Sequence, residues 1–174
     1  MVIIAVSTLL ASPTISKQDD PLEAYELTAS NFVGQKNNPA VIVTTIKASN
    51  DTRAESLAKF LQAQGSPMAP YSTDLVRIAD TYDLDWRLLP AISGVESTFA
   101  QAVPGGSYNP YGWNNGRSYF KSWVVASDYV ASQIKARWGA SGEINPWGIG
   151  PGYAASPTWA SRVNFNMKVI GQYQ

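Results

Sequence analysis

After position 50, apolar and polar residues alternate with the period of about 3.6 residues that is typical of amphipathic helices. The pattern predicts four such helices, at about 52–63, 70–82 and 119–138, and a last one that starts at an N-cap on Ser156 followed by Pro157. A more apolar helix follows the turn at 83–85 and reaches Phe99, with Asp85 as its N-cap and Pro90 in its first turn. The expected fold is therefore mainly α.

Two long loops interrupt this helical pattern, at Val103–Tyr119 and Gly139–Ala155. Loops of this length inside a small domain usually carry function. Residues 12–50 show no sustained helical period and contain a short β-prone stretch at 41–46. We therefore expect residues 1–50 to form an extended or disordered N-terminal arm or linker, and residues 51–174 to form one globular domain.

The first residues are apolar from Val2 to Ala11, which is about the length of the core of an export signal, although no basic segment precedes them. This run is too short to span a bilayer. It is interpreted as the remnant of an export signal or membrane anchor, with a strand or an unstructured arm as the alternatives. Export would place the protein outside the cytoplasm, with a membrane tether at its N-terminus.

The composition excludes several kinds of chemistry. The chain has no His and no Cys, which removes Ser-His-Asp and Cys-His catalysis and zinc sites built from those ligands. Carboxylates, Lys and Tyr remain as acid–base groups, and we expect no cofactor and no metal. The net charge is zero, with 13 basic and 13 acidic residues, which argues against a nucleic-acid partner.

Glu96 is unusual because it stands in the most apolar of the predicted helices. At helical spacing it follows Leu89 and Ser93, on a face that adjoins the apolar one. A carboxyl at such a border is partly desolvated, which favours the neutral acid that can protonate a glycosidic oxygen. From periodicity alone, a solvent-facing glutamate on an amphipathic helix is the stronger alternative.

A two-carboxylate glycosidase needs a partner for Glu96. No acid occurs between Ser97 and Ser127, so the partner would be Asp128, Glu143 or an acid of the 80–85 turn. Alternatively, an N-acetylated sugar can supply its own acetamide oxygen as the nucleophile. The sequence leaves both possibilities open.

Aromatic and amide side chains are concentrated in the two loops: Tyr108, Asn109, Tyr111, Trp113, Asn114, Asn115, Tyr119, Trp147 and Tyr153. Aromatic faces pack against sugar rings, and amides bond hydroxyl and acetamide groups. The alternative is that about half of these aromatics belong to the core, where aromatic residues dominate packing. The loops therefore favour a sugar substrate.

Three segments occur in order: Glu96-Ser97-Thr98-Phe99, Asn109-Pro110-Tyr111-Gly112-Trp113 and Tyr153-Ala154-Ala155-Ser156-Pro157. Together they resemble the bacterial glucosaminidase family (endo-β-N-acetylglucosaminidase domains) of the lysozyme superfamily, which shares the Glu-Ser signature with soluble lytic transglycosylases. The resemblance covers roughly residues 53–171. Ala155 and Ser156 stand where the family has Thr and Asp, and Tyr111 replaces its Phe.

The resemblance implies a lysozyme-like domain whose two loops line a substrate groove. It implies Glu96 as the general acid and Tyr153 as a second catalytic residue near the scissile bond. It further implies Asn109, Tyr111 and Gly112 as residues of the groove. From their chemistry and position, Ser97, Trp113 and, in the second loop, Trp147 are further candidates for contact with substrate.

We therefore expect a monomeric extracytoplasmic hydrolase that cleaves β-1,4 bonds of peptidoglycan or a related N-acetylated glycan, as an N-acetylglucosaminidase. A lytic transglycosylase would use the same acid and leave an anhydro end. A wall-binding module without catalysis is the alternative outside enzymes.

Overall fold

A computed structural model of the protein describes residues 51–142 and 144–173. The predictions made for residues 1–50, and for Glu143 as a second acid, lie outside the described residues. This part of the chain is mainly helical and contains no strand: α2 Arg53–Ala63, η1 Ala69–Tyr71, α3 Ser72–Thr81, α4 Leu88–Ser97, α5 Trp123–Trp138, η2 Gly139–Ser141, α6 Pro146–Tyr153 and α7 Trp159–Ile170. None of the helices in residues 51–173 described here has the length and apolar character that a membrane span requires.

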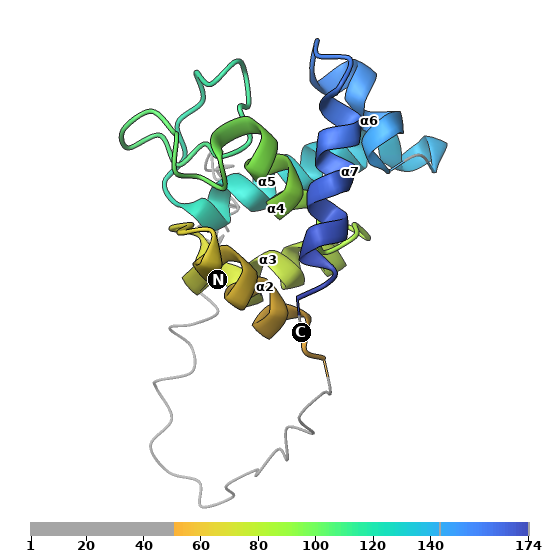
Figure 1. Cartoon of the computed structure of the whole chain (residues 1–174). Coiled ribbons are helices and arrows are strands. Elements are labelled where there is room, and N and C mark those ends of the chain that lie inside the picture. Colours follow the sequence, from red (N-terminus) through yellow and green to blue (C-terminus); the bar gives the residue numbers. More distant parts are fainter. Residues whose placement is uncertain (1–50, 143, 174) are drawn as a thin grey trace, which may run out of the picture. The chain divides into compact units, whose positions relative to one another are not determined.

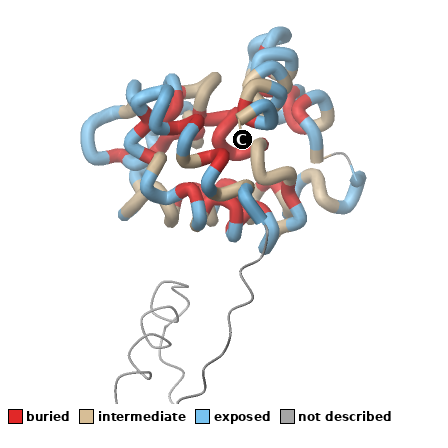
Figure 2. Tube along the Cα trace, turned by 60° about the horizontal axis from the view of Figure 1, so that its bottom comes forward, coloured by how far each residue is buried: buried red, intermediate tan, exposed pale blue. Residues whose placement is uncertain are grey.

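Helix α4 lies at the centre of these helices (Figure 1). It packs along α7 and against α3, while α2 packs on α3, α5 on α3, and α6 on α7. Leu88, Leu89, Ala91 and Ile92 of α4 are fully buried, and the trace of Figure 2 shows buried residues gathered along the inner faces of the helices. Burial on nearly all sides explains why this segment is more apolar than the amphipathic helices around it.

The predicted helices before Glu96 are confirmed, with small shifts at their ends. Helix α2 matches its prediction, whereas the second predicted helix divides into the turn η1 and the helix α3. The N-cap predicted on Asp85 is wrong, because Arg87 is the residue that precedes α4 at Leu88. The Oδ1 atom of Asp85 instead accepts the backbone N–H of Arg87 at 2.9 Å and closes the turn before the helix. Pro90 is the third residue of α4. Backbone N–H groups in the first turn of a helix have no partner within the helix, so the missing N–H of proline costs nothing there.

The helix predicted for 119–138 begins later, at Trp123. Ser122 has an extended backbone, and its hydroxyl accepts the N–H of Val125 at 3.2 Å, which is N-cap geometry. The prediction of a helical start at Tyr119 is therefore wrong by one turn. Residues 119–122 belong instead to the long loop after α4, which this shift extends.

The second predicted loop is wrong in a more important way, because it contains the helix α6. Its eight residues include three glycines and two prolines, which hide any helical period. Asn145 caps the helix by accepting the N–H groups of Trp147 and Gly148 at 3.0 and 3.1 Å, and Pro146 occupies the first position. Burial of Ile149 in the core stabilises a segment of weak intrinsic helix propensity.

The N-cap predicted on Ser156 is also wrong. Helix α7 begins at Trp159, and Thr158 precedes it without a capping side-chain bond. The carbonyl of Ser156 accepts the N–H of Trp159 at 3.1 Å, and its hydroxyl lies 3.2 Å from that of Thr158. Ser156 therefore shapes the turn before α7 through its backbone.

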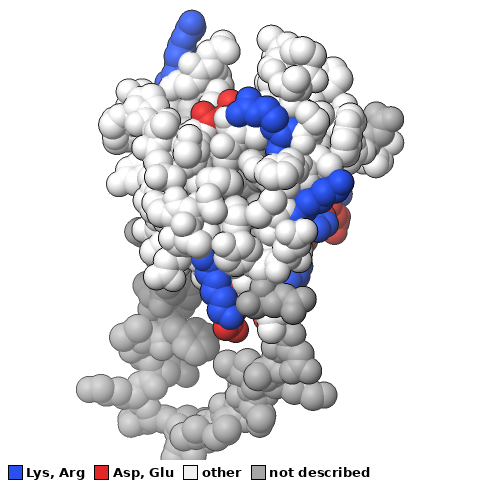
Figure 3. Space-filling model, viewed as in Figure 1, with Lys and Arg blue, Asp and Glu red and all other residues white. Residues whose placement is uncertain are grey.

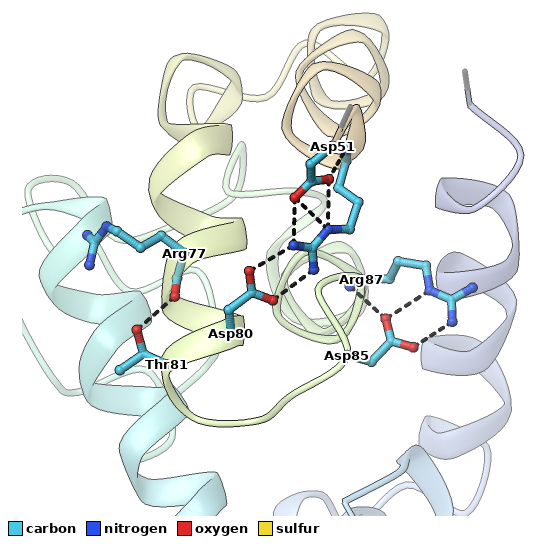
Figure 4. A network of polar contacts seen from close by, with 7 residues as sticks. Asp51, Arg77, Asp80, Thr81, Asp85 and Arg87 are labelled. Carbon is cyan, nitrogen blue, oxygen red and sulfur yellow. Dashed lines mark hydrogen bonds and ion pairs between the residues drawn. The ribbon is translucent and has the colours of Figure 1, made fainter. Parts of the chain in front are cut away.

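Two groups of ion pairs fix the chain at the ends of α2, α3 and α4 (Figure 4). Arg53 lies between Asp51 and Asp80, with a nitrogen 2.7 Å from each carboxylate, and so ties the start of α2 to α3. Arg87 binds Asp85 through its Nε at 2.8 Å as well as through its backbone N–H. Burial acts to raise the pKa of Asp85, but the hydrogen bonds and charge of Arg87 outweigh it and hold this pKa below its ordinary value.

We expect Asp85→Asn to destabilise the protein by about 1 kcal/mol at pH 7, a figure reduced for the partial exposure of the pair. Since the folded-state pKa is depressed, the stabilisation is present above the ordinary carboxyl pKa, and it disappears as the pH falls through the folded value. Urea unfolding at several pH values measures the difference. Glu55→Gln, in the exposed pair with Lys59, serves as the control. An equal effect of Asp85→Asn at every pH would contradict the ionic explanation.

Candidate active site

Glu96 is the penultimate residue of α4 and is half-buried. Its carboxylate faces a groove of about 510 Å³. The end of α4, the loop 98–122, residues 153–156 and the first turn of α7 form the walls of this groove. Most of the surface in Figure 3 is uncharged, and near the top of that view a small acidic area lies beside basic atoms. The structure thus brings all three segments of the sequence motif around one acid.

Trp159 orients the carboxylate of Glu96. The indole Nε1–H donates to Oε1 at 2.6 Å, and the Trp159 side chain is only 2 % exposed. The ring of Tyr153 stacks on the indole with centroids 4.9 Å apart and an angle of 27° between planes, so the donor cannot swing away. A hydrogen bond of this length fixes one oxygen of the Glu96 carboxyl group in place.

Gly112 lies against the other oxygen of the carboxylate. A Cβ atom built on this residue would be 2.6 Å from Glu96 Oε2 and 3.3 Å from Cδ. The φ angle of Gly112 is +62°, a conformation that other residues rarely adopt. The position therefore requires glycine twice over, for its backbone angle and for the close approach of the loop to the acid.

The chain reverses direction immediately after Glu96. Thr98, Phe99 and Ala100 have φ angles of 52°, 55° and 69°, in the left-handed region that is costly for residues with side chains. The Ser97 hydroxyl supports this turn, since it accepts the N–H of Ala100 at 3.1 Å and lies 2.7 Å from the carbonyl of Pro110. Ser97 is 3 % exposed, so its hydroxyl holds the loop against the helix end.

Phe99 anchors the same turn in the core. Its ring packs edge-on against Phe60 with centroids 5.2 Å apart, and it covers Gly94, where a Cβ would lie 2.4 Å from the ring. The buried aromatic side chain offsets the cost of the left-handed backbone. Strain of this kind is concentrated at functional sites.

Asn109 uses its hydrogen bonds within the loop. Its Nδ2 donates to the carbonyls of Trp113 and Ser118 at 3.0 and 3.1 Å, and its Oδ1 accepts the N–H of Trp113 at 3.0 Å. The residue is 2 % exposed but still lies at the wall of the groove. Asn109 thus fixes the shape of the loop that carries Gly112.

Tyr111 does not reach the groove with its side chain, contrary to the expectation from sequence. It is fully buried, and its hydroxyl lies 2.6 Å from the Ser127 hydroxyl of α5. Burial raises the pKa of this phenol above its ordinary value. The hydroxyl contact with Ser127 of α5 holds this ring in the core, and the segment meets the groove through Asn109 and Gly112 instead.

Tyr153, the last residue of α6, lies at the groove with Glu96. Its hydroxyl donates to the carbonyl of Tyr111 at 2.9 Å. Burial first, and then the charge of Glu96, raises the pKa of the Tyr153 phenol well above its ordinary value. The phenol therefore remains protonated at neutral pH. Because its O–H already donates to the carbonyl of Tyr111, Tyr153 contributes its ring to the groove.

Neither of the two tryptophans predicted to bind substrate lines the groove of Glu96. Trp113 forms a wall of an adjoining cavity of about 440 Å³, whereas Trp147 is 57 % exposed on α6 beside another hollow. That hollow shares Ala154 to Ser156 with the main groove. The structure thus gathers Glu96, Ser97, Asn109, Gly112 and Tyr153 at one groove and leaves Trp147 outside it.

Sequence reasoning did not assign Trp159 or Arg162 to this groove. Trp159 fits the apolar face of the last predicted helix, and Arg162, one turn later, has no distinguishing pattern; both lie at the groove. Their spacing of three places them on one helix face directly after the Tyr153 segment. The sequence did contain a signal for this role: a tryptophan directly after the Tyr153 segment, whose indole N–H can only donate a hydrogen bond.

No second carboxylate of the described residues lies at this groove. The acids considered as partners are occupied elsewhere: Asp80 pairs with Arg53, Asp83 with Lys135 and Asp85 with Arg87, while Asp128 accepts the Tyr82 hydroxyl. Among residues 51–142 and 144–173, no cluster of acids has an arrangement that could hold a metal ion.

Neither a protein-family model nor a curated protein matches the sequence.

Proposed function

We propose that the protein cleaves β-1,4 bonds of an N-acetylated glycan strand, with Glu96 as the general acid. One observation carries this proposal: a half-buried carboxylate, oriented by Trp159, stands at a groove in which no other described residue is acidic. The helical arrangement, with an acid near the end of a buried central helix, is also the one expected of a lysozyme-like domain.

In the proposed reaction, Glu96 gives its proton to the glycosidic oxygen as the bond from that oxygen to C1 breaks. The departing sugar keeps the proton as a hydroxyl group, and positive charge develops at C1. The acetamide oxygen of the sugar that carries C1 bonds to this carbon, in place of the nucleophile that a second carboxylate would provide. Water then attacks C1 and breaks the bond from C1 to the acetamide oxygen, while the Glu96 carboxylate takes a proton from the water and becomes the acid again.

The walls of the groove favour a sugar polymer. The rings of Tyr153 and, in the adjoining cavity, Trp113 offer aromatic surface, and Asn115 belongs to the walls of both spaces. Aromatic surface and amides are the combination that sugars require. Together with the motif resemblance, this supports peptidoglycan as the substrate and a site of action outside the cytoplasm.

A lytic transglycosylase is the second candidate, because a groove with one carboxylate also suits attack on C1 by the substrate's own 6-hydroxyl group. The experiment is digestion of purified peptidoglycan by the full chain, followed by mass spectrometry of the new ends. Reducing N-acetylglucosamine ends support the hydrolase, and anhydro ends support the transglycosylase. Binding to the wall without any new ends would contradict both and indicate a binding module.

Trp159→Phe should lower kcat for glycan cleavage by about ten- to a hundredfold, the scale expected when a catalytic group loses its positioning. The substitution keeps an aromatic ring in the core but removes the donor to Glu96 Oε1. Steady-state kinetics separate kcat from KM, and a thermal melt checks the fold. Trp123→Phe, which removes an indole that packs on Tyr108, is the matched control. Equal kinetics for the two variants would show that the bond to Glu96 has no role in the reaction.

A further inference from the structure

The cavity that adjoins the Glu96 groove contains a cation that the proposed reaction does not use. Arg137, in the last turn of α5, has its guanidinium carbon 4.9 Å from the centre of the Trp113 ring. Arg53, Arg87 and Lys135 each lie within about 3 Å of a carboxylate. Within the described part of the chain, Arg137 forms no such ion pair.

The cavity beside Arg137 adjoins the groove and shares wall residues with it. Its volume is about 440 Å³, and it shares Gly112, Asn115 and Tyr153 with the space in front of Glu96. Other walls come from Trp113 and from polar side chains, and no described residue at the cavity is acidic. A glycan strand bound beside Glu96 can therefore extend toward the positive charge of Arg137, which has no acidic residue beside it in the cavity.

The guanidinium of Arg137 lies over the Trp113 ring, and Arg137 is itself a wall of the cavity. A guanidinium held over an aromatic ring keeps N–H donors that an anion can accept. Two parallel N–H bonds match the two oxygens of a carboxylate. The charge of Arg137 also reaches the catalytic groove, because it lowers the pKa of Tyr153 against the raising effects of burial and Glu96.

We propose that this cavity is a subsite in which Arg137 binds a carboxylate carried by the glycan strand. The inference rests on the proposed function, since it extends the same groove. The carboxylate can belong to an acidic substituent on a sugar or to a peptide attached to it. Both have the same chemistry at Arg137, and a strand without such a group loses this contact.

Calorimetric binding to Glu96→Gln, which does not cleave its ligand, tests the inference. The probes are a neutral N-acetylglucosamine tetrasaccharide, an alternating tetrasaccharide of N-acetylglucosamine and N-acetylmuramic acid, and the latter with its peptides. We expect the full-length protein to prefer a carboxylate-bearing probe, and Arg137→Gln to reduce that preference about tenfold, as for the loss of one charge-assisted contact. A loss seen with the peptide-free acidic probe assigns the carboxylate to the sugar, and a loss seen only with peptides assigns it to them.

Lys59→Gln removes the same charge from the exposed face of α2 and should leave the preference unchanged. If Arg137→Gln also leaves it unchanged, or if Arg162→Gln alone removes it, the subsite at Arg137 is refuted while glycan binding stands. If no tetrasaccharide binds, the proposed glycan groove itself is wrong, and the subsite is refuted with it.

Discussion

Glu96→Gln should reduce glycan cleavage by about a hundred- to ten thousandfold, the usual contribution of a general acid. The amide has nearly the same shape as the carboxyl group, and its oxygen can still accept the Nε1–H of Trp159 that lies 2.6 Å from Glu96 Oε1. It cannot deliver a proton to a glycosidic oxygen. Release of new glycan ends from purified peptidoglycan measures the loss, and the thermal midpoint should change little.

Asp128→Asn provides the matched control for that result. Asp128 lies on α5 and accepts the Tyr82 hydroxyl at 3.2 Å, a bond that an amide oxygen can also accept. It is not among the residues at the groove, so cleavage should continue at the rate of the unaltered protein. Undiminished cleavage by Glu96→Gln would refute the assignment of the acid. Loss of cleavage in Asp128→Asn would instead indicate a two-acid mechanism.

Gly112→Ala should impair both the fold and the reaction. A methyl group at this position would lie 2.6 Å from Glu96 Oε2, and the φ angle of +62° is unfavourable for alanine. We expect a loss of about 1–2 kcal/mol in the free energy of unfolding, mainly from backbone strain, because the end of the Glu96 side chain can shift away from the methyl group. Cleavage should fall at least about tenfold, because the carboxylate must move away from its position beside Trp159.

Gly106→Ala separates the two causes of that loss. Gly106 has a φ angle of +71°, but a Cβ there would meet no atom within 4 Å. Alanine at this position therefore introduces only the backbone strain, about 1 kcal/mol, and makes no contact with Glu96. Urea unfolding and cleavage assays on both variants give the comparison. If the two variants behave alike, the approach of Gly112 to the carboxylate does not matter for the reaction.

The local pattern of the sequence predicts the helices that bury one face, and it fails where tertiary contacts replace propensity. The α4 segment is apolar because it is covered on most sides, and the charge of Glu96 is conspicuous against that apolar run. Helix α6 escapes prediction because its glycines and prolines carry no period, and Asn145 and the burial of Ile149 stabilise it instead. The late start of α5 likewise depends on the Ser122 cap.

At the candidate site, too, some features follow from the sequence and others are decided only by the fold. The sequence places Glu96, Asn109 and Tyr153 in one functional motif, and the fold brings them to one groove. The motif could not show that Tyr111 turns into the core or that Asn109 is engaged within its own loop. Which face of an irregular loop meets solvent depends on contacts with distant helices, and no local period encodes it.

The sequence by itself determined a mainly helical domain without His or Cys chemistry, and it pointed to one acid in an apolar helix. Only the tertiary structure decided what surrounds that acid. Trp159 is 63 positions away from Glu96 in sequence, and Gly112 meets the carboxylate only because three left-handed residues reverse the chain after α4. Spacing along a helix is a local property, whereas the orientation of the Glu96 carboxyl group depends on packing between segments far apart in the chain.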